Sequence, residues 1–281
     1  MRSTRLGTDW TVNKSTSLLT SPLFHVSGLS AGVVTALFAG TTTYIYEGRF
    51  DPQNILRVID KHKITSWGGA VPTALKRVLD EAPNHNLDYE SMLVVGGGGA
   101  PMPETLIART KQIFKNVEHN FGYGYGLTES GAITVVNWGD DLNNFPRSPG
   151  KPMPTIEVKL IDDDGNEIFD DEVEGEICVR SPSVMLGYYK NQIESNKSLN
   201  KDRFLSTGDY GYRKDDLYFI SSRRTDLILR GAENVYPQEI EILLDQYDGV
   251  AESAVIGVPH DDLGEEVKAI VVLENLSLIH I

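Results

Sequence analysis

Short apolar runs alternate with amphipathic segments through the first half of the chain. Runs rich in β-branched or aromatic residues, which are typical of buried strands, lie at 41–46, 64–67 and 92–95. The segments that follow them carry apolar residues three or four positions apart and open with proline, which predicts helices beginning at Pro52, Pro72 and Pro103. This alternation predicts a mostly parallel sheet covered by helices. Residues 1–20 show no clear period and are assigned no element.

Beyond Asn137 the pattern changes to short alternating strands. They are predicted at 156–161, 176–180, 217–221, 227–229 and 254–258, with a helix that begins at Pro237. Asp162 to Asn166 are turn-forming residues between two extended runs, which predicts a hairpin. A calcium loop is rejected, because Glu167 and Val173 stand where it needs glycine and glutamate. After an acidic loop the chain ends in apolar sequence at 270–273 and 276–281, from which we expect a truncated polypeptide.

The chain holds 281 residues, with 26 Lys plus Arg against 40 Asp plus Glu and a net charge of −14. This acidity argues against a nucleic-acid partner, because neutralising many phosphates needs surplus cations, but backbone N–H groups and one local cation suffice for a nucleotide. Cys178 is the only cysteine, so an internal disulfide is excluded and a buried, unreactive thiol is expected. No apolar stretch approaches the ~20 residues of a transmembrane segment, and no secretory signal is seen, so a cytoplasmic protein is expected.

Two glycine-rich loops are candidates for binding a nucleotide. Gly96 to Pro101 follows a buried strand, where missing side chains let a flat ligand approach the backbone, although a tight strand-to-helix turn explains the glycines too. The loop is not the dinucleotide fingerprint, in which a helix opens directly after the glycines. The second loop runs from Gly122 to Ser130. The ring of Tyr125 could stack on a base, the Thr128 hydroxyl suits a phosphate oxygen, and the Glu129 carboxylate suits a Mg²⁺ ion. An ordinary glycine-rich surface loop is the alternative.

The third candidate is the segment from Ser206 to Asp209, with Arg223 following at a distance. An acidic residue in a glycine turn suits a ribose diol, although such segments, taken alone, more often serve as caps or surface charge. His25 stands beside apolar residues, which is more typical of a packed, hydrogen-bonded histidine than of a site residue. The chain has no His or Cys pair at ligand spacing, which argues against zinc enzymes.

Taken in this order, the loops resemble those of the adenylate-forming (AMP-binding) superfamily of acyl-CoA synthetases, luciferase-like enzymes and peptide-synthetase adenylation domains. The resemblance covers about Pro22 to Lys268 and rests on these segments: Pro22–Gly28, Gly98–Pro101, Tyr125–Ser130, Gly175–Tyr189, Ser206–Asp209 and Glu233–Glu241. It implies an α/β fold, with a large domain of mixed sheets covered by helices and a β-rich subdomain at 1–224. The start of a small α+β C-terminal domain is implied at 225–281.

The resemblance also implies a role for each matching residue. For the nucleotide these are Gly99, Ala100 and Pro101 at the adenine, Tyr125 stacked on it beside Gly126, Asp209 at the ribose hydroxyls, and Arg223 at the ribose or the phosphate. The implied catalytic residues are Thr128 at the α-phosphate, Glu129 as the Mg²⁺ ligand, and His25 at the carboxylate end of the acyl pocket.

The implied activity is that of an ATP-dependent acyl-CoA ligase, with ATP, Mg²⁺ and CoA as cofactors. A carboxylate oxygen attacks the α-phosphorus of ATP, pyrophosphate leaves, and the CoA thiol then attacks the mixed anhydride. A metal ion and hydroxyl donors lower the first barrier by stabilising charge on the phosphoryl oxygens. Phe24, His25 and the apolar stretch Gly28–Phe38 favour a fatty or other apolar carboxylic acid, with an aryl acid left open. No transmembrane segment is implied, and a homodimer is left open.

Departures from the family pattern limit what this polypeptide is expected to do alone. The family's phosphate-binding loop precedes the Pro22 segment and has no match here, and Lys268 does not lie at the motif of the catalytic lysine. We therefore expect little or no adenylation from these 281 residues. Thr225 replaces the usual hinge Asp or Lys, and Ala232 replaces a glycine, which would crowd the pantetheine route. The alternatives are a non-catalytic nucleotide- or acyl-binding module and an adenylation domain that loads a carrier protein.

Overall fold

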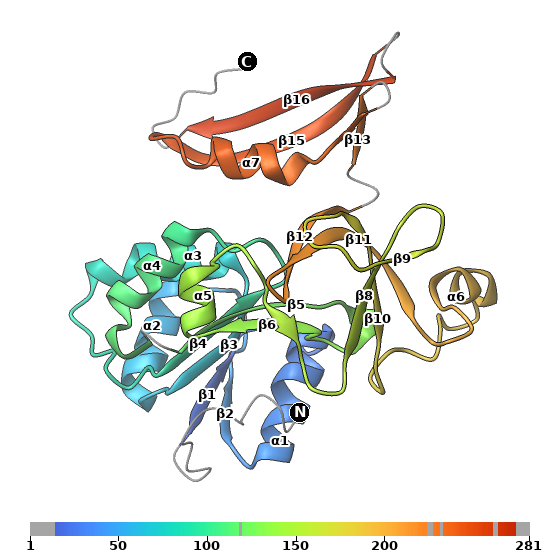
Figure 1. Ribbon diagram of the computed structural model, residues 1–281. Coiled ribbons are helices and arrows are strands. Elements are labelled where there is room, and N and C mark those ends of the chain that lie inside the picture. Colours follow the sequence, from blue (N-terminus) through green and yellow to red (C-terminus); the bar gives the residue numbers. More distant parts are fainter. Residues whose placement is uncertain (1–14, 118–119, 224–226, 231–232, 261–263, 274–281) are drawn as a thin grey trace. The chain divides into compact units, whose positions relative to one another are not determined.

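A seven-stranded sheet is the largest of the protein's three sheets. The structure is a computed structural model that describes residues 15–117, 120–223, 227–230, 233–260 and 264–273. The strand order of this sheet is β2-β1-β3-β4-β5-β6-β7 (Figure 1). The strands are β1 (Thr16–Leu19), β2 (Thr42–Ile45), β3 (Ser66–Ala70), β4 (Val94–Gly98), β5 (Phe121–Tyr125), β6 (Val135–Trp138) and β7 (Lys151–Pro152). Strands β1 to β5 pair in parallel, while β6 and β7 are antiparallel. The predicted mostly parallel sheet is confirmed, and β1, β6 and β7 are additions to it.

Helices follow these strands along the chain. They are the π-helix η3 (Ser27–Val34), α1 (Thr35–Ala39), α2 (Pro52–His62), α3 (Pro72–Glu81), α4 (Glu104–Ile113) and α5 (Asp140–Asn144), with single 3₁₀ turns η4 (Ala82–Asn84), η5 (Lys115–Val117) and η6 (Thr128–Ser130). Asp51 caps α2, because its carboxylate accepts hydrogen bonds from the backbone N–H groups of Gln53 and Asn54 at 3.0 and 3.3 Å. Figure 1 shows α2, α3 and α4 on one side of the sheet and α1 on the other. The three predicted helices are confirmed, although Pro103 lies one residue before α4.

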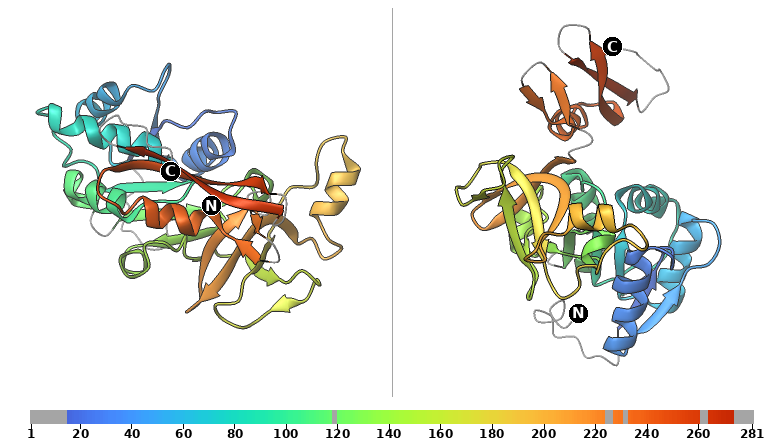
Figure 2. Two further views of the ribbon diagram at one scale, coloured as in Figure 1. Left: turned by 90° about the horizontal axis from the view of Figure 1, so that it is seen from above. Right: turned by 90° about the vertical axis from the view of Figure 1, so that its right-hand side faces the viewer.

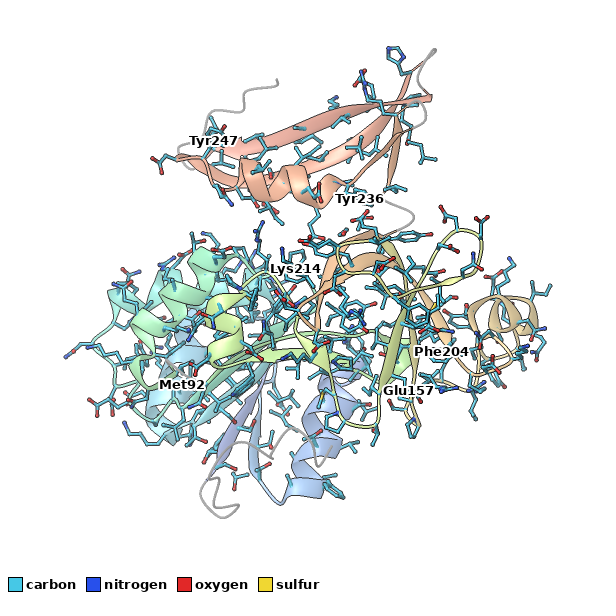
Figure 3. All side chains as sticks on the ribbon, in the orientation of Figure 1. Met92, Glu157, Phe204, Lys214, Tyr236 and Tyr247 are labelled. Atoms are coloured by element: carbon cyan, nitrogen blue, oxygen red, sulfur yellow. The ribbon has the colours of Figure 1, made fainter. Side chains whose placement is uncertain are left out.

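The hydrophobic core of the seven-stranded sheet lies against α2, α3 and α4. Apolar residues of the helices and of the adjoining strands and loops are fully buried there: Ile55, Leu56, Ile59, Trp67, Leu75, Leu79, Met92 and Phe114 (Met92 is labelled in Figure 3). Burying each large apolar side chain contributes roughly 1.5–3 kcal/mol. The indole N–H of Trp67 is satisfied as well, since it donates to the Thr20 hydroxyl at 3.0 Å.

A five-stranded sheet of order β12-β11-β10-β8-β9 follows in sequence. Its strands are β8 (Glu157–Ile161), β9 (Glu167–Ile168), β10 (Gly175–Arg180), β11 (Leu205–Lys214) and β12 (Leu217–Arg223), with helix α6 (Gln192–Ser198) between β10 and β11. The predicted hairpin turn joins β8 to β9, and the Asp162 carboxylate accepts from the N–H groups of Asp164 and Asn166 at 3.0 and 2.7 Å. These hydrogen bonds, above all those from Asn166, hold the pKa of Asp162 below its usual range. The guanidinium of Arg180 lies over the ring of Phe204, 4.4 Å from its centroid, and forms an ion pair with Glu157. Figure 3 labels Phe204 and Glu157.

The C-terminal part is a four-stranded sheet of order β14-β13-β16-β15. Its elements are β13 (Ile228–Arg230), β14 (Glu233–Val235), α7 (Pro237–Leu244), β15 (Val250–His260) and β16 (Gly264–Leu273), and α7 lies along the sheet in both views of Figure 2. The acidic loop predicted after the strand at 254–258 is wrong in extent, because Glu265 and Glu266 belong to strand β16 and pair with residues of β15. Glu266 also forms an ion pair with Arg230 of β13. The apolar end 276–281 and the sequence departures Thr225 and Ala232 lie outside the described residues.

Two compact units account for the chain. One comprises the residues up to Val158 with Val179–Leu205 and Asp216–Tyr218, and the other comprises Lys159–Cys178, Ser206–Asp215 and the chain from Phe219 onward. Within the described residues, no helix combines the length and the apolar character that crossing a membrane requires.

Candidate functional site

Neighbouring parallel strands of the seven-stranded sheet lead into the predicted site segments. β1, β4 and β5 end just before or within these segments, and β3 lies between β1 and β4. Because these strands are parallel, their carboxyl ends meet at one edge of the sheet, where open α/β sheets bind ligands. The predicted site residues at or beyond these strand ends are His25, Gly99, Ala100, Pro101, Tyr125, Gly126, Thr128 and Glu129.

Gly98 and Gly124 face each other where β4 and β5 end. A Cβ atom on Gly98 would lie 2.4 Å from the carbonyl oxygen of Gly124, so this close pairing requires glycine. Gly99 comes directly after β4, and Tyr125 is the last residue of β5. Gly99 is exposed, and a Cβ atom there would meet nothing closer than Cγ1 of Val71 at 3.8 Å. The strand end therefore offers bare backbone with open space over it, which suits a flat ring.

Thr128 and Glu129 lie in the 3₁₀ turn η6, directly after β5. Buried Ser130 closes this turn, since its hydroxyl donates to the Leu127 carbonyl at 2.9 Å and accepts from the Leu127 N–H at 3.2 Å. Thr128 is left exposed and Glu129 half-buried. The Glu129 carboxylate accepts a hydrogen bond from the hydroxyl of Tyr188 at 2.9 Å. The turn thus presents a hydroxyl and an oriented carboxylate side by side.

Tyr188 has no role predicted from the sequence, yet its hydroxyl contacts a predicted site residue, Glu129. It lies in one of the matching segments, but the adjacent Tyr189 is equally eligible by sequence, and only the fold brings Tyr188 to Glu129 across 59 positions. Burial raises the pKa of the Tyr188 phenol, and the hydrogen bond to Glu129 raises it further. The hydroxyl is therefore protonated, and able to donate, throughout the neutral range.

His25 begins the turn that leads into η3. Its Nδ1 lies 2.8 Å from the Ser27 hydroxyl and accepts the Ser27 N–H at 3.2 Å, so the proton of a neutral ring belongs on Nε2. The hydroxyl of Ser21 donates to the Gly69 carbonyl at 3.3 Å and ties this segment to the end of β3. His25 is hydrogen-bonded, as one interpretation predicted, but it is exposed rather than packed in the core.

Asp209 and Arg223 meet in the other unit, on the neighbouring strands β11 and β12. The side chain of Asp209 is 5% exposed and its Oδ1 accepts from Arg223 Nε at 2.9 Å, while the Arg223 side chain is 64% exposed. The Asp209 N–H donates to the Thr207 hydroxyl at 3.1 Å, and that hydroxyl donates to the Ile177 carbonyl at 2.7 Å. The predicted site residues therefore form two sets, one on each unit.

Glu129 is the candidate metal ligand among the described residues at this edge of the sheet. No cluster of three or more His, Cys, Asp or Glu in this part of the chain could hold a metal ion. Glu129 offers a single carboxylate, which suits Mg²⁺, because that ion keeps several waters and binds through one or two carboxylates plus substrate phosphates. Cys178 is buried as predicted, and burial raises the pKa of its thiol to about 11.

Two family models match the sequence. The model described as "AMP-binding enzyme" matches residues 1–189, and the model described as "AMP-binding enzyme C-terminal domain" matches residues 239–279. Among curated relatives, a long-chain-fatty-acid–CoA ligase of Bacillus subtilis (strain 168) is 35% identical over 90% of this chain and 44% of its own length. A 2-succinylbenzoate–CoA ligase of Oceanobacillus iheyensis is 34% identical over 88% of this chain and 49% of its own.

A solved enzyme shares the fold. The o-succinylbenzoate CoA synthetase of Bacillus subtilis, in complex with its acyl-adenylate intermediate, is 31% identical with a TM-score of 0.84 over 98% of this chain and 54% of its own. Its complex with ATP and magnesium ion gives a TM-score of 0.82 at 30% identity, over 97% of this chain and 54% of its own. The chain spans about half the length of the curated relatives it matches, 44% and 49% in these two cases.

Proposed function

Because the chain belongs to the AMP-binding enzyme family, we propose that it forms part of an ATP-dependent acyl-CoA ligase. Such an enzyme joins a carboxylic acid to AMP with release of pyrophosphate and then transfers the acyl group to the CoA thiol. The supporting observation is that a bare glycine edge, Tyr125 and the Thr128–Glu129 turn lie at or just beyond the ends of the adjacent parallel strands β4 and β5. A base, a phosphate and a divalent cation of one nucleotide need surfaces of these kinds close together.

The residues at this edge fit an adenine nucleotide and its magnesium ion. Gly99, with Ala100 and Pro101, leaves exposed backbone for the adenine, and Tyr125 beside Gly126 supplies a ring to stack on it. Thr128 would donate its hydroxyl to the α-phosphate, and Glu129 would hold Mg²⁺. When bound, the ion supplies charge stabilisation at the phosphoryl oxygens.

Asp209 and Arg223 are proposed to recognise the ribose part of the nucleotide. Asp209 fits the ribose hydroxyls, because its carboxylate can accept hydrogen bonds from a diol and is held in place by Arg223 at 2.9 Å. Arg223 is exposed enough to reach the ribose or a phosphate. His25 would border the carboxylate of the acid, with Nε2 as its donor. We propose the domain division 1–224 and 225–281, which the separate match of residues 239–279 supports.

CoA enters this proposal through the relatives that are named CoA ligases. The acid is proposed to be a fatty or other apolar one, since the segment from Leu23 to Phe38, which contains His25, carries exposed apolar side chains: Leu23, Phe24, Leu29, Leu37 and Phe38. A cytoplasmic setting is part of the proposal, supported by the single, unpaired cysteine. A homodimer is proposed as the assembly, to be tested by sedimentation velocity.

Binding of a stable acyl-adenylate mimic, an acyl-sulfamoyl adenosine, tests the proposal without requiring turnover. We expect isothermal titration calorimetry on these 281 residues to detect binding that strengthens as the alkyl chain lengthens. Asp209→Ala is expected to weaken binding about 10-fold or more, as loss of hydrogen bonds to a charged group does. Lys197→Ala is the control, because its ion pair with Glu194 lies at the surface. Absence of binding, or equal affinity for all variants, would overturn the proposal.

Pyrophosphate exchange separates the ligase from its alternatives. A longer protein that contains this chain is expected to exchange pyrophosphate into ATP when an apolar acid is present, and to release thioester only with CoA. Binding without exchange would favour a non-catalytic module. Transfer to a carrier protein in place of CoA would favour a carrier-loading adenylation domain.

A further inference from the structure

We propose that Tyr188 is a positioning residue that orients the Glu129 carboxylate for its divalent cation. The Tyr188 hydroxyl donates to Oε1 of Glu129 at 2.9 Å. Among the residues that the structure describes, none donates a hydrogen bond to Oε2, so this oxygen is the one available to a cation. The inference rests on the proposed function, because the cation is the one carried by the nucleotide.

A strap formed by residues 181–188 holds the backbone of the same turn. The Met185 N–H donates to the Glu129 carbonyl at 2.8 Å, and the Ser183 hydroxyl donates to the Ser130 carbonyl at 2.8 Å. Arg203 in turn donates to the Met185 carbonyl at 2.7 Å. Both the main chain and the side chain of Glu129 are therefore fixed by one neighbouring segment, which is more than an incidental surface contact provides.

Tyr188 is itself held in place by helix α6. Its N–H donates to the hydroxyl of buried Ser195 at 2.8 Å, and that hydroxyl donates to the Asn191 carbonyl at 2.7 Å. Gly187 permits this approach, since its φ is +153° and a Cβ atom there would lie 2.8 Å from the Ser195 hydroxyl oxygen. The tyrosine ring is thus carried by a backbone anchored on both sides, and its hydroxyl reaches Glu129 from a fixed origin.

An oriented carboxylate binds a cation better than a freely rotating one, because the entropy of ordering it has already been lost on folding. Hydrogen-bond partners of metal ligands typically change metal affinity by about 10–100-fold when they are removed. Orientation matters most for a single carboxylate that shares its ion with phosphates, because its own geometry then sets the protein's part of the coordination. The effect is expected in the dependence of nucleotide binding on Mg²⁺.

The test is the Mg²⁺ dependence of nucleotide binding by these 281 residues. The probe is the non-cleavable analogue α,β-methylene-ATP, titrated calorimetrically over a series of Mg²⁺ concentrations. Tyr188→Phe removes only the hydroxyl and is expected to raise the Mg²⁺ concentration for half-maximal binding by about 10-fold. Tyr189→Phe is the matched control, since it removes the same group from an 88% exposed neighbour whose hydroxyl makes no hydrogen bond to the described residues. Both variants are expected to melt within a few degrees of the parent.

A double-mutant cycle ties the effect to Glu129. Glu129→Gln is expected to abolish the Mg²⁺ dependence, and adding Tyr188→Phe to it is expected to change nothing more. If the parent responds to Mg²⁺ and to Glu129→Gln but Tyr188→Phe matches Tyr189→Phe, the Tyr188 proposal alone is overturned. If the parent binds no nucleotide, or Glu129→Gln leaves its Mg²⁺ response intact, the proposed function fails and this inference fails with it.

Discussion

Arg223 donates from Nε to Oδ1 of Asp209 across 2.9 Å and joins an exposed guanidinium to a carboxylate that is almost fully buried. A carboxylate removed from water depends on its partners to stay charged at low cost. Arg223→Ala is therefore expected to lower the free energy of unfolding by about 1.5–3 kcal/mol, the usual worth of a hydrogen bond to a charged group. Urea denaturation followed by circular dichroism measures the change.

Lys197→Ala provides the comparison for this prediction. Lys197 and Glu194 form an ion pair of similar length, 2.7 Å, but both side chains lie in solvent. Such surface pairs contribute only about 0–1 kcal/mol. Equal losses from Arg223→Ala and Lys197→Ala would show that burial of Asp209 adds nothing to its pairing with Arg223.

Gly98→Ala is expected to destabilise the protein because the new methyl group would lie 2.4 Å from the Gly124 carbonyl oxygen. The strands β4 and β5 must then separate locally, and such overpacking costs about 1–3 kcal/mol. Gly68→Ala on the adjacent strand β3 is the matched control, since a Cβ atom there meets nothing within 4 Å. Thermal melting of both variants measures the difference, and a Gly98→Ala protein as stable as Gly68→Ala would contradict the close pairing.

Helix α2 shows what the sequence determines locally. The Asp51 cap, the proline after it and the apolar face of Ile55, Val58 and Ile59 all lie within nine residues, and together they predicted the element. Helix α6 was missed for the opposite reason. Its one large apolar residue, Ile193, is 71% exposed, so no periodic pattern exists, and the helix depends on the Asn191 cap instead.

The candidate site divides in the same way. Tyr125, Gly126, Thr128 and Glu129 lie within one short segment at the end of β5, so their chemistry was visible in the sequence. The partnership of Tyr188 with Glu129 was not, because 59 positions separate the two and Tyr189 offers the same hydroxyl. Strand β1 was likewise missed, since its four residues become a strand only by pairing between β2 and β3.

Asp51→Ala is expected to lower the free energy of unfolding by about 1 kcal/mol, because two N–H groups at the start of α2 lose their acceptor. Asp51→Ser keeps a capping oxygen and is expected to recover most of that loss. Chemical denaturation of the two variants in parallel makes the measurement. A Ser variant as unstable as the Ala variant would show that the Asp51 charge, and not its hydrogen bonds, stabilises the helix.

Alkylation of Cys178 is expected to be slow in the folded protein and fast after unfolding. Burial raises the pKa of the thiol from the ordinary 9.0 to about 11, and only the thiolate attacks iodoacetamide. At pH 8 the thiolate fraction is then about 0.1% folded against about 10% unfolded, a difference of roughly 100-fold in rate before steric protection is counted. Because the folded pKa is the higher one, the folded rate should keep rising tenfold per pH unit through pH 10, where the unfolded rate has levelled off. Mass spectrometry of the carbamidomethylated protein, with and without urea, follows both rates, and a folded rate that levels off near pH 9 would contradict the buried, neutral thiol.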